Sequence, residues 1–180
     1  KQIDRAPSAF TLYSRDNRNN VLMGGKKVHF GNGGRAFRIL DLISGGYRET
    51  LLRDIANSAA LVQNLDRIQV YIIACQAYDI DPEYYHVHDF YHAFNNTTKH
   101  VMGGCDTLEG AKQMYELACI IADDEEELQD RPFVSVITNP NSPLSIDEHT
   151  LKILDFFTAR GIPVTCATAP IAGATAPVTL

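Results

Sequence analysis

The chain has 180 residues, of which 45% are apolar and 21% are charged, and its formal net charge is −6. This composition is ordinary for a globular protein, and the length is enough for one domain with a real core. The sequence has no basic patch with interleaved aromatic residues and no apolar run of the ~20 residues that a membrane-spanning helix needs. We therefore expect neither nucleic acid nor a membrane as a partner.

The four cysteines are scattered along the chain and form no Cys-x-x-Cys pair: Cys75, Cys105, Cys119 and Cys166. This spacing argues against a zinc ribbon or a redox dithiol. We interpret the cysteines as buried, reduced thiols and expect a cytoplasmic location. A thiolate bound to a metal is the alternative.

Residues 9–31 are expected to form β structure, because the apolar segments FTLYS and VHF flank the turn-forming residues DNRNN. Residues 38–49 predict a second hairpin that turns at residues 44–46. Thr50 can cap a following helix whose apolar residues recur at helical spacing: Leu51, Ile55, Ala59, Val62 and Leu65. We assign residues 1–66 to an N-terminal β-rich extension that ends in this helix.

From residue 67 onward the sequence alternates between strands and helices. Strands are predicted at residues 68–74, 100–104, 133–138 and 163–168, with helices at 82–95, 107–122 and 146–159. Ser145 and Glu148 match a capping box for the last helix, and Gly161 closes it. Because helical crossovers connect parallel strands, these four units predict one parallel sheet.

The fold class is therefore α/β, as either a barrel or a doubly wound sheet. A dinucleotide site of the doubly wound type needs a glycine turn that feeds a helix, but the nearest match, Gly31-x-Gly33-x-x-Ala36, leads into residues that look like a strand. A (β/α)8 barrel has eight units and typically about 250 residues. We interpret residues 67–180 as the first half of a TIM barrel and expect the chain to be part of a longer protein.

Three of the six histidines lie in residues 81–95 (DPEYYHVHDFYHAFN). If this stretch were extended, His86 and His88 would share a face and could bind zinc in a TIM-barrel hydrolase. A helix is favoured instead, because Asp81 and Pro82 match a helix start and a regular apolar face follows: Val87, Phe90, Tyr91 and Phe94. On a helix His86 points about 200° away from His88. We therefore predict no metal site and keep the hydrolase as the alternative.

The acidic run at residues 123–127 (DDEEE) lies between a predicted helix and a predicted strand. It is typical of a solvated loop on the side of a barrel remote from the reaction. A docking patch for a partner protein is the alternative.

Four segments carry a family resemblance: APSAFTLYSRD with NVLMGGKKVHFGNGG, NNTTKHVMGG, RPFVSVITNPNSPL and GIPVTCATAPIAGATAPVTL. They resemble the trimethylamine methyltransferase superfamily, in order, from about residue 6 to residue 180. The last segment is the most specific. The superfamily includes pyrrolysine-containing trimethylamine enzymes and homologues without pyrrolysine, among them glycine betaine methyltransferases.

The resemblance implies a TIM barrel with an N-terminal β-containing extension. It also implies transfer of a methyl group from a small methylated amine to the Co(I) of a corrinoid (cobalamin) that a separate corrinoid protein carries. Family members are longer, and the pyrrolysine position of the amine-demethylating branch lies beyond Leu180. We expect the 180 residues alone to be inactive, and homo-oligomers are possible because an incomplete barrel has open strand edges.

In a TIM barrel the site lies on the loops that follow the strands. This rule selects loop residues after the four predicted strands as substrate- or corrinoid-binding candidates: Gln76 and Tyr78, then Gly103 and Gly104, then Asn139 and Asn141, then Thr168. No catalytic residue is assigned.

Each candidate has a chemical role and a structural alternative. Tyr78 offers a cation–π face to a quaternary ammonium group, whereas Asn139, Asn141 and Thr168 can donate to the carboxylate of a betaine. Gly103 and Gly104 would let the corrinoid ring approach the backbone. The alternatives are a packed loop tyrosine, asparagines that only shape a turn, and a tight glycine turn.

Overall fold

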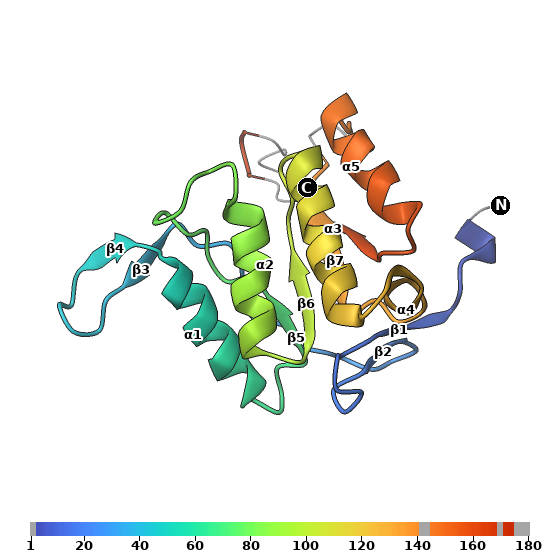
Figure 1. The fold of residues 1–180 in the computed structure, drawn as a ribbon, viewed down its shortest axis with the longest axis horizontal. Coiled ribbons are helices and arrows are strands. Elements are labelled where there is room, and N and C mark those ends of the chain that lie inside the picture. The colour runs from blue at the N-terminus through green and yellow to red at the C-terminus, as the bar shows by residue number, and fades with distance from the viewer. Residues whose placement is uncertain (1–2, 141–144, 169–170, 175–180) are drawn as a thin grey trace.

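The computed structural model describes residues 3–140, 145–168 and 171–174. Its centre is a four-stranded parallel sheet in the order β5-β6-β7-β8 (Figure 1). The strands are β5 (Val70–Ile72), β6 (His100–Gly103), β7 (Val134–Thr138) and β8 (Val164–Cys166). The four predicted strands and their parallel pairing are therefore confirmed.

The helices lie side by side against this sheet (Figure 1). They are α1 (Leu52–Gln63), α2 (Tyr85–Asn96), α3 (Leu108–Ala122) and α5 (Glu148–Thr158), with the short α4 (Glu125–Asp130) before β7. α1 packs against α2, α2 against α3, and α3 against α5, so neighbours in sequence are neighbours in space. The fold is mixed α/β, with strands that follow one another across the sheet in chain order.

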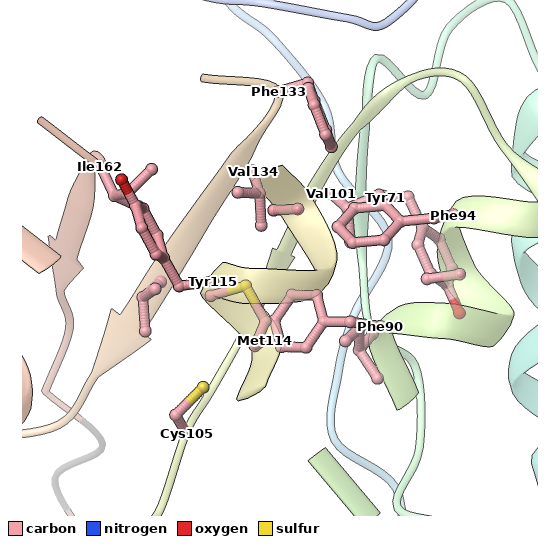
Figure 2. Close-up of a cluster of buried hydrophobic side chains, with 14 of the residues drawn as sticks. Tyr71, Phe90, Phe94, Val101, Cys105, Met114, Tyr115, Phe133, Val134 and Ile162 are labelled. Atoms are coloured by element: carbon pink, nitrogen blue, oxygen red, sulfur yellow. The ribbon is translucent and has the colours of Figure 1, made fainter. Parts of the chain in front are cut away.

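One hydrophobic core lies between the sheet and its helices (Figure 2). Tyr71 and Val101 contribute from the strands, and Phe90 and Phe94 from α2, all at most 2% exposed. Burial of each such side chain stabilises the fold by about 1.5–3 kcal/mol. α1 contributes Ile55, Ala59 and Val62 to the same cluster. The division into an N-terminal extension (residues 1–66) and the first half of a barrel (residues 67–180) stays a prediction.

Two hairpins precede the sheet, formed by β1 (Ala9–Leu12) with β2 (Val21–Gly24) and by β3 (Arg38–Leu40) with β4 (Tyr47–Glu49); a 3-10 turn, η1 (Ile3–Arg5), comes first. The predicted second hairpin is thus confirmed. The first hairpin packs Leu12 and Val21 against Val70, the first residue of β5. It therefore lies at the N-terminal ends of the strands.

Residues 30–36, which we call the edge segment, run parallel to β5 along its outer edge. Isolated bridges join Gly31 to Val70 and Ala36 to Cys75. Between them the Asn32 side chain accepts from the Ile72 N–H (2.8 Å) and donates to the Ile72 carbonyl (2.6 Å). The amide side chain thus substitutes for a strand backbone, and the edge of β5 is paired.

The predicted boundaries of α2 and the face that it buries were partly wrong. The helix begins at Tyr85 rather than Pro82, because Asp81 is used in the preceding turn, where its Oδ1 accepts from the Glu83 N–H (2.9 Å). Tyr91 is 50% exposed, whereas His86 and Asp89 are 2% exposed. His86 and Asp89 face inward because they have partners there: the Asp106 N–H donates to His86, and Arg35 lies beside Asp89.

Three further local predictions were wrong. Thr50 does not cap α1, because its buried hydroxyl donates to the Gln76 carbonyl, and Asp54 instead accepts from the Leu51 N–H (2.8 Å). The cap of α5 is Asp147, which accepts from the Thr150 N–H (2.8 Å), rather than Ser145. The acidic run at residues 123–127 is not a loop, because residues 125–127 form the first turn of the short helix α4 and Asp124 caps that helix.

Candidate functional site

A cavity of about 460 Å³ lies where the strands end. It includes Ile73 just beyond β5, Gly103 at the end of β6, Asn139 just beyond β7, and Val164 in β8. Its wall is divided between polar and apolar surface, and the apolar part includes Ile72, Val136, Ile137, Ile153, Leu154 and Phe157. The cavity therefore occupies the C-terminal edge of the parallel sheet, opposite the hairpin β1–β2. In α/β folds this edge is the usual place for ligands.

Some of the predicted site residues meet at this cavity and others do not. Gly103, Gly104 and Asn139 line it. Gln76 and Tyr78 are absent from the described lining: the Gln76 N–H donates to the Ala36 carbonyl (3.0 Å) and the Tyr78 N–H to the Thr50 carbonyl (2.9 Å). Both hydrogen bonds thus join the loop after β5 to residues that precede α1.

The two residues predicted on the later loops fall elsewhere. Thr168 is described but is not among the described residues that line the cavity. Asn141 lies outside the described residues. Ligand binding by these two side chains, and by Gln76 and Tyr78, stays a prediction.

The two glycines differ in the space beside them. A Cβ at Gly103 would lie 2.6 Å from Phe90 Cζ and 2.7 Å from Ile73 Cδ1, so the chain's own core fills that space. A Cβ at Gly104 would have the Ile137 carbonyl oxygen as its nearest neighbour, 3.7 Å away. Of the two, only Gly104 leaves room on the cavity side for the close approach of another group.

A charged cluster forms one part of the polar wall of the cavity. Arg35, from the edge segment, places Nη2 3.6 Å from Asp89 Oδ2 and Nη1 3.6 Å from Asp106 Oδ2. Its guanidinium also lies over the ring of Tyr85, 5.0 Å from the centroid, and the Tyr85 hydroxyl donates to Asp106. Three segments far apart in sequence thus converge: the edge segment, α2 and the end of β6.

His86 supports this cluster as a neutral side chain. Its Nε2 accepts from the Asp106 N–H (2.8 Å), which leaves that nitrogen without a proton. Burial lowers the pKa of His86 to about 4, so the imidazole is uncharged at neutral pH. Its role is to hold the backbone of Asp106 in place beside Arg35.

Asp89 has the most perturbed carboxyl group of the site. Burial raises its pKa to about 7, while the nearby Arg35 lowers it and Asp106 raises it further. Such a value lets the group exchange a proton near neutral pH. The neighbouring thiols differ, because burial raises the pKa of Cys75 and of Cys105 to about 12. Both thiols therefore stay protonated.

The histidines do not converge on one point. His86 is turned toward Asp106, whereas the ring of His88 lies 6.4 Å from that of His92. Across the described ranges, no group of three or more His, Cys, Asp or Glu is arranged to hold a metal ion. No specific observation favours the metal-dependent hydrolase.

Sequence reasoning missed Arg35, Asp89 and Asp106. Asp89 could have been noticed in the sequence, because it lies three residues after His86 and hence on the same side of a helix. Arg35 and Asp106 had no comparable signal, because only the folded chain brings the edge segment next to the end of β6.

A parallel sheet with a partly charged cavity at its C-terminal edge defines the class: an α/β protein with a cavity of the size that small ligands occupy. The model of the family "Trimethylamine methyltransferase (MTTB)" matches residues 1–180, and the chain belongs to this family. The segment from residue 3 to 140 and those at 145–168 and 171–174 include no helix long and apolar enough to cross a membrane.

Three curated relatives illustrate the similarity. The chain is 34% identical over 178 residues to the trimethylamine methyltransferase MttB of Desulfitobacterium hafniense and 29% identical over 180 residues to a glycine betaine methyltransferase of that species. It is 26% identical over 185 residues to the MttB of Methanosarcina thermophila. These alignments cover 99–100% of this chain but only 36–38% of each relative. The chain thus spans little more than a third of the length of these relatives.

Proposed function

We propose that this chain is part of a methyltransferase that moves a methyl group from a small methylated amine to a corrinoid. The observation that carries the proposal is the family match along all 180 residues, combined with a cavity of small-ligand size at the C-terminal edge of the sheet. The names of its relatives point to trimethylamine or a quaternary amine such as glycine betaine.

The sheet supports a partial TIM barrel as the architecture. In a doubly wound sheet the strand order reverses at a switch point and helices cover both faces. Here the order is β5-β6-β7-β8 and each helix packs against the next one. The edge segment lies parallel to β5, and α1 connects the two along the chain. Together they resemble one more strand–helix unit in front of the four predicted units.

The residues present fit a corrinoid that approaches from outside the cavity. Bound to its own carrier protein, such a group in the Co(I) state supplies the nucleophile that takes the methyl group. Gly104 leaves room for close approach and Asn139 offers an amide at the same rim. The apolar walls, including Ile137 and Leu154, exclude water from the amine.

The corrinoid protein is the partner that this chemistry requires, and we place the reaction in the cytoplasm, where a reduced cofactor and reduced thiols persist. We expect the 180 residues alone to be inactive, because the remaining length of the relatives would supply the other wall of the cavity. Homo-oligomerisation stays a prediction.

The test uses the full-length protein that contains this chain, its corrinoid protein reduced to Co(I), and trimethylamine or glycine betaine in separate reactions. Loss of one methyl group from the amine, measured by mass spectrometry together with the change in corrinoid absorbance, is expected for one of them. Demethylation of neither amine, nor of other methylated amines, would refute the proposed function. Gly104→Leu should slow the reaction without unfolding the chain, whereas Gly33→Ala, at a site with no atom within 4 Å of an added Cβ, serves as the control.

A further inference from the structure

The charged cluster holds polar atoms that the protein itself does not satisfy. Asp89 Oδ1 and Arg35 Nε and Nη2 are buried and have no hydrogen-bond partner among the described residues. The two ion pairs of Arg35 are both 3.6 Å long, beyond the 2.7–3.2 Å that is typical of N–H···O hydrogen bonds. Buried groups of this kind normally have partners. Arg35 and Asp89 also line the cavity, so a ligand bound there would lie next to this unsatisfied pair.

The charges of the cluster indicate which ligand fits. Asp89 and Asp106 face the single guanidinium of Arg35, and His86 is neutral, so the fully ionised cluster has one negative charge in excess. A cation with one positive charge balances this excess. A zwitterion such as a betaine leaves the excess in place and adds a carboxylate beside Asp106.

The geometry around Asp89 also matters for a proton on the ligand. Asp89 Oδ1 is a lone acceptor, and its side chain is only 3% exposed. A protonated tertiary amine in the cavity has one N–H, which can donate to Asp89 in a charge-assisted hydrogen bond once a rotation of the side chain brings this oxygen to the cavity surface. A quaternary amine has no N–H and would leave the oxygen unsatisfied, which costs affinity.

We propose that Asp89, positioned by Arg35, is the counter-ion of the substrate's nitrogen and selects a protonated tertiary amine over a betaine. This inference rests on the proposed function for the class of ligand. When the carbon–nitrogen bond breaks, its electron pair stays on nitrogen, and the amine leaves neutral with its proton still directed at Asp89. The carboxylate thus keeps the departing nitrogen protonated.

The proposal implies that binding is linked to a proton. Asp89 faces Arg35 from the edge segment and Asp106 from the loop after β6, and it influences Tyr71, Cys75 and Cys105, which are uncharged at neutral pH. Because burial raises the pKa of Asp89 to about 7, about half of the free protein carries a proton there at pH 7. A bound cation requires the ionised form, so that proton must leave.

The experiment is calorimetric titration of the full-length protein, without corrinoid, using trimethylammonium chloride as the probe. Measurements in two buffers of different ionisation enthalpy give the number of protons released. We expect about half a proton released at pH 7 and about tenfold tighter binding at pH 8 than at pH 6. Tetramethylammonium and glycine betaine should bind more weakly than trimethylammonium.

Asp89→Asn should weaken the binding of trimethylammonium at least tenfold and abolish its pH dependence. Asp130→Asn, at an exposed position on α4, is the matched control and should change neither. If Asp89→Asn does not fold, the proton release of the unmodified protein still decides the question. No proton release, no binding of any amine, or equal affinity for betaine would overturn the inference.

Failure of this inference is distinguishable from failure of the proposed function. Methyl transfer with an amine affinity that is the same at pH 6 and pH 8 would refute the role of Asp89 and leave the methyltransferase standing. Proton-linked binding of trimethylammonium without methyl transfer would refute the methyltransferase and leave the role of Asp89 standing.

Discussion

Gly110 in α3 lies directly against His86 in α2, so that a Cβ built at Gly110 would come within 2.8 Å of His86 Cδ2. The absence of a side chain therefore lets the two helices approach where His86 supports Asp106. We predict that Gly110→Ala shifts His86 and destabilises the protein by about 1–3 kcal/mol, as overpacking of a core does. Chemical denaturation would measure this cost.

Gly33→Ala is the control for that substitution, because nothing lies within 4 Å of a Cβ at Gly33. We expect a change within about 0.5 kcal/mol there. A Gly110→Ala protein that is as stable as the original, with an unchanged His86 signal in NMR spectra, would show that the helices are not in close contact at this point.

Lys99 is a buried lysine whose ammonium group closes the end of α1. Its Nζ donates to the carbonyls of Val62 (2.7 Å), Leu65 (2.8 Å) and Ile68 (2.7 Å), and the side chain is almost fully enclosed. Lys99→Met should destabilise the protein by about 3 kcal/mol, because each buried carbonyl that loses its donor costs about 1–3 kcal/mol. Thermal or urea unfolding would measure the loss.

Lys112→Met is the comparison for Lys99→Met. Lys112 is half-exposed and forms a 3.6 Å ion pair with Glu109, one turn away on the same helix. Such surface pairs contribute little, so we expect a change of less than about 1 kcal/mol. Equal effects of the two substitutions would argue against a capping role for Lys99.

His100 should make the fold sensitive to acid. Its Nδ1 is 2.9 Å from the Tyr13 carbonyl and its Nε2 is 2.8 Å from Ser135 Oγ, and burial lowers its pKa from 6.5 to about 4. Between these values the unfolded chain takes up a proton that the folded chain does not. The contribution is thus fully present above pH 6.5 and is lost as the pH falls toward 4, by about 3 kcal/mol. His100→Gln should flatten this part of a stability–pH curve, measured by urea unfolding at each pH.

Asp89 should act on stability in the opposite direction. Its pKa is raised from 3.8 to about 7, so between these values the folded protein binds a proton that the unfolded chain has released. Stability from this group therefore falls as the pH rises from about 4 to about 7. Asp89→Asn should remove the effect and make the acid-induced loss of stability steeper between pH 6.5 and pH 4. An unchanged curve for Asp89→Asn would indicate an ordinary, solvated carboxyl group.

Most of the sheet could be predicted from the sequence, because its strands are short apolar runs and its helices have regular apolar faces. The errors occurred where a polar side chain prefers a partner distant in sequence to a local role. Thr50 was expected to cap a helix, but it donates to the carbonyl of Gln76 instead. Asp89 and His86 were not part of the predicted apolar face of α2, but both are buried, because Arg35 lies beside Asp89 and the Asp106 N–H donates to His86.

The site was less predictable than the fold for a related reason. The rule that loops after strands hold the site located Gly103, Gly104 and Asn139 at the cavity. It failed to identify the charged cluster because Arg35 comes from the edge segment, which is not a regular strand and precedes the first predicted unit. No local pattern in one sequence reveals that residues 35, 89 and 106 meet.

The pairing of the edge segment with β5 also determines the order in which the sheet can be assembled. With one side of β5 already occupied by the edge segment, the next strand of the chain can join this sheet beside β8, at the opposite edge. The sheet thus grows in chain order, which is also the order in which a ribosome delivers the strands. Each new strand would find its template already synthesised, and in a closed barrel only the last strand would have to pair with a distant partner, the edge segment.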